Sequence, residues 1–250
     1  MKALILLLAS LLAPSAHSEE LAPVTPYRPS VSSPAQLPAA GQLELELGAL
    51  SASSDGARRH SLPYSLKLAL DSEWGLVLGG EGLVWAPLEH GRQRGMGDTQ
   101  LVLKRAFVLS DDSALGLELG AKAPTARRGI GSGKADYSLN GIVSQDLGAL
   151  HLDANLNLTR IGAIEAGSGR HQTGISTAFS SALDERWGVT AEWSGSRRRG
   201  SASTAQVLLA LSYSPSKLVT LDLGVAHGLT SATPHWSVFS GAVLPLARLW

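Results

Sequence analysis

Residues 150–159, Leu-His-Leu-Asp-Ala-Asn-Leu-Asn-Leu-Thr, alternate apolar and polar side chains without a break. Successive side chains of a β-strand point to opposite faces, so this spacing gives a strand one apolar and one polar face. A helix, with its period of 3.6 residues, would scatter both sets around its circumference. The stretch therefore predicts an amphipathic strand.

The same alternation recurs from residue 42 to the end of the chain, for example at 43–47 and 115–119. Twelve strands are predicted in this region, many of them long enough to cross a membrane at a tilt, which takes roughly 9–11 residues. Their ranges are 42–50, 62–71, 74–86, 97–109, 113–123, 135–147, 150–161, 170–183, 187–195, 203–213, 218–228 and 235–250.

The connections between these strands alternate in length. Long loops are predicted at 51–61, 87–96, 124–134, 162–169, 196–202 and 229–234, and short turns near residues 72–73, 110–112, 148–149, 184–186 and 214–217. Outer-membrane barrels have long outer loops and short periplasmic turns, and an even strand count returns both termini to the periplasm. We therefore predict an all-β fold over 42–250, an up-and-down antiparallel transmembrane β-barrel of about twelve strands. A soluble β-sandwich also alternates, but its inner face favours Val, Ile and aromatics over this Leu-rich set.

The first 41 residues divide into two parts. Lys2 precedes the apolar run 3–13, and small residues flank a cleavage position after Ser18, so residues 1–18 are predicted to be a cleaved signal peptide. The run is too short to span a membrane as a helix, which takes roughly 20 residues. Residues 19–41 are rich in proline and are expected to form an unpacked periplasmic lead. The expected location is the bacterial outer membrane.

The last strand carries aromatic and apolar residues at alternate positions and ends in Trp250. Tryptophan suits the membrane interface, and a C-terminal aromatic strand resembles the signal that the barrel-assembly machinery reads. Trp250 is therefore predicted to be the assembly signal.

Several function classes lack support in the sequence. The net charge is zero, with 21 basic and 21 acidic residues, which gives no global attraction to nucleic acid. The chain has no cysteine, its histidines have no metal-ligand spacing, and it contains no Gly-x-Ser-x-Gly motif. No catalytic residue, metal or cofactor is assigned, and we do not expect an enzyme; an outer-membrane lipid-modifying enzyme remains a minor alternative.

Charged and amide side chains on the polar face are candidates for the lumen, where they must pair with one another or with water. They could form a closed structural network or line a polar pathway for a solute. The candidates are Glu44, Glu46, Lys67, Glu81, Asp98, Lys104, Glu118, Lys122, Asp153, Asn155, Glu192 and Asp222.

Arginines concentrate in the predicted long loops and would form a basic rim at the outer mouth. Such a rim suits contact with lipopolysaccharide phosphates in the outer-membrane lipid, or the steering of anionic solutes. Its members are Arg58, Arg59, Arg92, Arg94, Arg127, Arg128, Arg197, Arg198 and Arg199.

Four short segments, in order, resemble a known family: 95–101 (GMGDTQL), 122–137 (KAPT to DY), 187–192 (WGVTAE) and 221–228 (LDLGVAHG). They are similar to the outer-membrane, transporter-like family named for the meta-pathway of phenol degradation. The resemblance implies an outer-membrane barrel that passes small, hydrophobic or aromatic compounds, with no catalytic or binding residues attached. We therefore expect a passive channel for small solutes; the alternative is a non-transporting structural or surface-binding barrel.

Overall fold

The computed structural model describes residues 20–88 and 91–250, so the predicted signal peptide, 1–18, lies outside the described residues. These residues form thirteen strands in a single antiparallel sheet. The strands are β1 (Gln42–Ser54), β2 (Ala57–Ala69), β3 (Trp74–Leu88), β4 (Gly91–Gly95), β5 (Thr99–Ser110), β6 (Ser113–Ala123), β7 (Asp136–Leu147), β8 (Leu150–Arg160), β9 (His171–Ala182), β10 (Trp187–Arg198), β11 (Thr204–Ser216), β12 (Val219–Gly228) and β13 (Trp236–Arg248).

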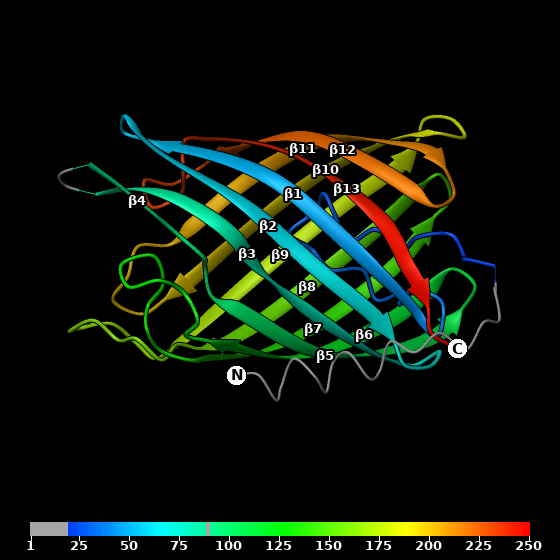
Figure 1. Cartoon of the computed structure of the whole chain (residues 1–250), viewed down its shortest axis with the longest axis horizontal. Helices are drawn as coiled ribbons and strands as arrows, with labels where there is room; N and C mark the ends of the chain where they lie inside the picture. The colour runs from blue at the N-terminus through cyan, green and yellow to red at the C-terminus, as the bar shows by residue number, and fades with distance from the viewer. Residues whose placement is uncertain (1–19, 89–90) are drawn as a thin grey trace.

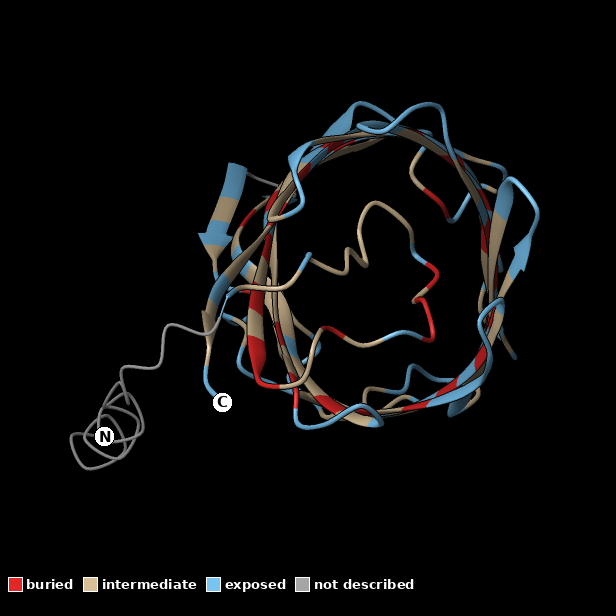
Figure 2. Ribbon diagram, turned by 90° about the vertical axis from the view of Figure 1, so that its right-hand side faces the viewer, coloured by how far each residue is buried: buried red, intermediate tan, exposed pale blue. Residues whose placement is uncertain are grey.

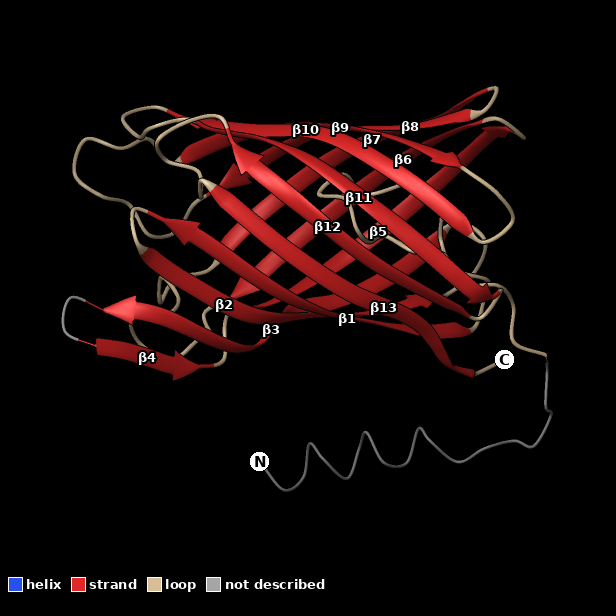
Figure 3. Cartoon of the chain, turned by 90° about the horizontal axis from the view of Figure 1, so that it is seen from above, coloured by secondary structure: helices blue, strands red, loops and turns tan. Residues whose placement is uncertain are grey.

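Twelve of these strands close into a barrel (Figure 1). Strand β1 pairs with β13 and β2, and β3 pairs with both β2 and β5, which leaves no open edge in the ring. Strand β4 pairs only with the end of β3, as a hairpin that projects beyond the barrel at the end opposite the C-terminus (Figure 3). The predicted up-and-down barrel is therefore confirmed.

No segment of the described chain forms a helix long and apolar enough to cross a membrane.

The alternation that decides the fold separates the two faces of the wall. In β8, Leu156 is 52% exposed on the outside, whereas its neighbour Asn155 is 7% exposed and faces the lumen. Asn155 pairs with Ile142 of β7, which is also buried. Exposed leucines and tryptophans thus form the outer surface of the barrel, as a lipid-facing wall requires.

Two of the predicted long loops are wrong. Residues 51–61 are not a loop, because β1 and β2 continue to a two-residue turn at Asp55 and Gly56, whose φ angles are 45° and 80°. An Asp-Gly pair at positive φ forms the tight hairpin turn that matches strand twist. The predicted loop 87–96 likewise contains the end of β3 and all of β4. These stretches consist mainly of small and polar residues, so they lack the apolar–polar alternation that marks the other strands.

Residues 20–41 differ most from expectation. Instead of forming an unpacked lead, they enter the barrel at the short-turn end and cross its lumen (Figure 2). We call residues 20–41 the internal segment. Its prolines prevent a regular strand, so its free main-chain groups bind side chains of the wall instead. A twelve-strand barrel is wider than the eight-strand barrels that side chains alone can fill, which leaves room for this segment.

Candidate functional site

The internal segment contacts several strands on the inside of the wall. Near the turn end, the amide of Val24 donates a hydrogen bond to the carbonyl of Lys217 (2.9 Å). Further along, the amide of Ala35 donates to Ser144 Oγ (2.7 Å) on β7. The segment then returns to the wall, where the amide of Gly41 donates to the carbonyl of Ala69 (2.9 Å). It therefore touches strands on opposite sides of the lumen.

A buried ion cluster holds the first part of the segment. Lys67 Nζ lies 2.9 Å from Glu44 Oε2 and 2.7 Å from Glu46 Oε1, and its side chain is fully buried. The same carboxylates accept from the segment: Glu44 from the amide of Thr25 (3.1 Å) and Glu46 from that of Tyr27 (2.7 Å). Lys67 also donates to the carbonyl of Thr25. The cluster is thus shared between the wall and the segment.

The Tyr27 ring lies between two lysines, with Lys67 Nζ 4.2 Å and Lys104 Nζ 4.1 Å from its centroid. Such cation–π contacts stabilise a desolvated ammonium group. Burial, followed by the nearby carboxylates, raises the pKa of the Tyr27 phenol well above its usual range, so the hydroxyl stays protonated and donates to the carbonyl of Gln36 (2.9 Å). Lys104 also pairs with Glu118 (3.2 Å) and donates to the carbonyl of Pro34.

Arg28 anchors the segment on the neighbouring strands β12 and β13. Its Nε and Nη2 donate to the two oxygens of Asp222 at 2.9 and 3.0 Å, a bidentate pair, and Nη2 also donates to the carbonyl of Ser240 (3.1 Å). The guanidinium approaches the backbone at Gly48 and Gly241, where an added Cβ would lie 2.5 and 2.3 Å from its atoms. Glycine at these positions makes the close approach possible.

Glu192 and Asn155 hold the middle of the segment. Glu192 Oε2 accepts from the amides of Val31 (2.8 Å) and Ser32 (3.0 Å), while its Oε1 has no hydrogen-bond partner among the described residues. Asn155 accepts from the Ser33 amide and donates to the Ser33 carbonyl, both at 2.9 Å. The wall therefore binds main-chain groups of the segment.

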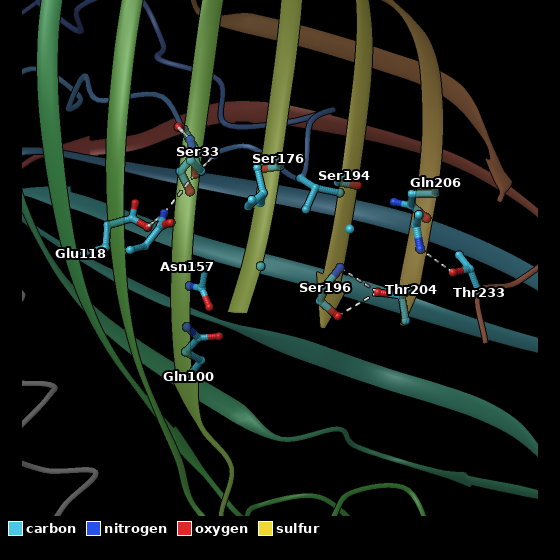
Figure 4. A pocket seen from close by; sticks show the side chains of 17 residues that line it. Ser33, Gln100, Glu118, Asn157, Ser176, Ser194, Ser196, Thr204, Gln206 and Thr233 are labelled. Atoms are coloured by element: carbon cyan, nitrogen blue, oxygen red, sulfur yellow. Dashed lines mark hydrogen bonds between the residues drawn. The ribbon is translucent and has the colours of Figure 1, made fainter. Parts of the chain in front are cut away.

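Two cavities lie on either side of this contact. A cavity of about 440 Å³ opens toward the long loops and is lined by Ser176, Ser194 and Gln206 (Figure 4). A second, of about 480 Å³, lies at the short-turn end and reaches Thr190. Ser194, Glu192 and Thr190 follow one another on the inward face of β10, so the bond from Glu192 to the segment separates the cavities.

The predicted lumen candidates fall into several groups. Glu44, Glu46 and Lys67 meet in the buried cluster, Lys104 pairs with Glu118, and Glu192, Asn155 and Asp222 bind the segment. Near the long loops, Lys122 bridges Asp98 (3.1 Å) and Asp136 (2.7 Å), and Glu81 pairs with Arg59 (2.7 Å). Asp153 accepts from Ser144 near the turns.

Ser144, Asp153 and His151 are close together, a set of residue types that hydrolases use. Ser144 Oγ donates to Asp153 and accepts from the amide of Ala35, while His151 contacts Asp153 (3.3 Å) and Asp146. A nucleophilic serine instead needs its hydroxyl bound to the base. The group is therefore a structural contact between the wall and the internal segment.

Most arginines of the predicted rim are exposed at the long-loop end, as on β4 and in the loop after β6. Arg127 donates to the carbonyl of Arg94 (2.7 Å), and the Arg94 guanidinium lies 5.7 Å from the Trp85 ring. Arg59 differs, because it turns into the lumen toward Glu81. At the other end, Trp250 is 54% exposed, and the amide of Leu249 donates to the carbonyl of Gly41 (2.8 Å).

Sequence reasoning missed Tyr27, Arg28 and the apolar residues Leu208 and Phe239, which face the lumen. One signal was present: Arg28 is the single basic residue of 19–41. A second was the uninterrupted apolar run at 207–211, which is apolar on both faces of its strand.

A family model described as "Putative MetA-pathway of phenol degradation" matches residues 27–246, which include most of the internal segment and nearly all of the barrel. The chain belongs to this family. The resemblance found in the sequence is therefore confirmed. No curated protein matches the sequence.

Several solved structures share the fold. An outer-membrane channel from Pseudomonas putida F1 superimposes with a TM-score of 0.68 at 14% identity, over 89% of this chain and 100% of that one. The KdgM porin gives 0.56 at 10% identity, over 81% and 99%. The CymD monoaromatic hydrocarbon channel gives 0.50 at 10% identity, over 83% and 89%. At these identities the likeness establishes the fold.

Proposed function

We propose that this family member is a passive channel for small compounds in the bacterial outer membrane, and that its internal segment forms the narrowest part of the path. The observation that carries the proposal is the pair of cavities on β10, separated by the bond from Glu192 to Val31 and Ser32. A solute that passes the main chain at Val31 and Ser32 would move from the cavity at the long-loop end of the barrel to the cavity at the short-turn end.

The comparisons support a channel rather than a structural shell. The neighbours in fold are a channel, a porin and a monoaromatic hydrocarbon channel, and the family description concerns phenol degradation. We infer a small compound, hydrophobic or aromatic, as the solute. The long loops would face outward, with the exposed arginines against lipopolysaccharide, and the signal peptide would be removed near Ser18. Assembly by the barrel-assembly machinery would read the exposed Trp250.

Single-channel conductance in planar bilayers tests the proposal. The mature protein, beginning at Glu19, should give small, discrete current steps. A variant that lacks residues 20–36 should conduct several times more current, because the obstruction is gone while the twelve-strand ring remains. Heat-dependent migration on gels would verify that both proteins form closed barrels, since a barrel without edges resists detergent until it is heated.

The alternative, a non-transporting barrel, has one observation in its favour: Lys67, Glu44 and Glu46 form an almost fully buried cluster between the wall and the segment. The same recordings distinguish the two. Silent full-length protein together with a conducting deletion variant would show that the segment seals the barrel. Silence in both proteins would contradict the channel proposal altogether.

A further inference from the structure

A third cavity, of about 370 Å³, lies between the internal segment and the wall formed by β1, β2 and β11–β13. It differs from the cavity lined by Ser176, Ser194 and Gln206, which we call the polar cavity. One wall of the third cavity is apolar: Leu208, Ala226 and Phe239 are buried there, and Leu50 packs against them. Leu50 and Phe239 are direct partners across β1 and β13. A cluster of inward-facing apolar side chains is unusual in a water-filled lumen, because barrel interiors are generally polar.

The apolar wall is closely packed at Phe239. The Phe239 ring lies against the backbone of Gly224, where an added Cβ would be 2.3 Å from the ring. Pro29 and Val31 of the internal segment complete the cavity from the other side. The segment therefore forms part of a concave site as well as an obstruction. A volume of this size falls within the range of small-molecule pockets, about 300–1,000 Å³.

Two arginines border the cavity, and each is already neutralised. Arg28 forms its bidentate pair with Asp222, and Arg59 pairs with Glu81. The Nη1 group of Arg28 has no hydrogen-bond partner among the described residues, so it remains a donor for a ligand. A ligand carboxylate bound there would lie near the carboxylate of Asp222, and like charges at close range repel. A cationic ligand would be repelled by the positively charged guanidinium groups of Arg28 and Arg59.

We propose that this cavity binds a small neutral compound that has an apolar ring and one hydrogen-bond-accepting oxygen. The ring packs against Phe239 and Leu208, and the oxygen accepts from Arg28. The cavity shares Val31 and Gln206 with the polar cavity, so a bound solute lies directly beside the proposed path. The site rests on the proposed function only in that its ligand reaches it through the lumen.

Equilibrium binding tests the site independently of current. Full-length mature protein in lipid nanodiscs is titrated with 4-fluorobenzyl alcohol and monitored by ¹⁹F NMR, with empty nanodiscs of the same lipid subtracted. We expect saturable binding at one site. The anion 4-fluorobenzoate should bind about tenfold more weakly or worse, because of the nearby carboxylates. Absence of saturable binding of the alcohol, or equal or tighter binding of the anion, would overturn the proposal.

Matched variants locate the binding. Phe239→Ala should weaken binding of the alcohol by about five- to tenfold, since the ring contact is lost. Phe179→Ala is the control, because Phe179 is 44% exposed on the outside of β9. The paired change Arg28→Met with Asp222→Asn removes the guanidinium donor without leaving a lone buried charge, and should weaken binding several-fold. Unchanged affinity in Phe239→Ala would refute the location.

The two proposals fail in different ways. Binding that follows this pattern in a protein without conductance would leave the site standing and contradict the channel. Conductance together with identical affinities in Phe239→Ala and Phe179→Ala would leave the channel standing and refute the site.

Discussion

The barrel wall and the internal segment are stabilised by different kinds of contact. The wall is held by continuous main-chain ladders, and its apolar side chains face outward at alternate positions. The segment has no ladder along its length. Its main-chain groups bind individual side chains of the wall, such as Glu46, Glu192 and Asn155. Stability of the wall is therefore distributed over many residues, whereas docking of the segment depends on a few.

The largest effect is expected where the two regions share one buried cluster. Lys67→Met should destabilise the protein by about 3–5 kcal/mol, because it leaves Glu44 and Glu46 buried without their counter-charge. Urea unfolding of the refolded barrel in lipid vesicles measures the change in the free energy of unfolding. The control combines Lys67→Met with Glu44→Gln and Glu46→Gln, which removes the uncompensated charge. A single variant as stable as the wild type would show that the cluster is hydrated rather than buried.

A smaller loss is expected on the lipid-facing side of the wall. Leu156→Arg, near the middle of β8, should cost about 2–4 kcal/mol, since an arginine would enter the apolar layer. Leu150→Arg, at the turn end of the same strand, should cost about 0–1 kcal/mol, because the membrane interface tolerates charge. The same unfolding measurement compares the two variants. Equal costs at the two positions would contradict the lipid-facing orientation of β8.

This difference between the regions also explains which parts of the structure sequence reasoning could reach. Alternation is a local property of each strand. It therefore predicts the faces of residues such as Leu156 and Asn155 without knowledge of the neighbouring strands. The internal segment carries no period, and its position depends on distant residues such as Glu192 and Asp222. Its proline content indicated only that it forms no ladder.

The apolar side of the lumen was beyond prediction for a related reason. The alternation predicts apolar residues outward and polar residues inward, a rule that Leu208 and Phe239 break. Their inward position follows from the fixed parity of β11 and β13, in which Leu209 and Val238 already occupy the outer face. The site beside Arg28 depends in addition on where the segment crosses, which only the folded chain defines.

A third prediction separates the regions most directly. Glu192→Ala removes the acceptor for the amides of Val31 and Ser32, which should loosen docking of the segment by about 1–3 kcal/mol. The ring of strands should remain intact. We expect a higher single-channel conductance, faster hydrogen exchange at these two amides and unchanged heat-dependent migration. Glu185→Ala, at an exposed short turn, is the control. Conductance equal to that of the wild type would contradict the role of Glu192 in the barrier.

The smallest effect is expected at a short turn of the wall, far from the segment. Two turns share the pattern Asp-x-x-Trp-Gly, at 71–75 and 184–188. In the second, Asp184 Oδ1 accepts from the amides of Arg186 (2.7 Å) and Trp187 (2.8 Å). In the first, Asp71 accepts in the same way from Glu73 (2.8 Å) and Trp74 (2.7 Å). Each carboxylate closes a turn and positions the tryptophan that begins the next strand.

The amides of Arg186 and Trp187 hold the pKa of the Asp184 carboxyl below its usual value. Because the folded-state pKa is lowered, the stabilisation is present above the unfolded-state pKa, about 3.9, and is lost as the pH falls through the folded value. Asp184→Asn should therefore lower the urea midpoint slightly at pH 7, and the difference from the wild type should shrink as the pH falls from about 4 and vanish once it is below the lowered folded-state pKa. Asp111→Asn is the control, since the Asp111 carboxylate accepts no hydrogen bond within the described chain. The difference in urea midpoint between Asp184→Asn and the wild type could instead persist unchanged into acid. This would show that the introduced Asn side chain fails to close the turn for reasons other than its missing charge.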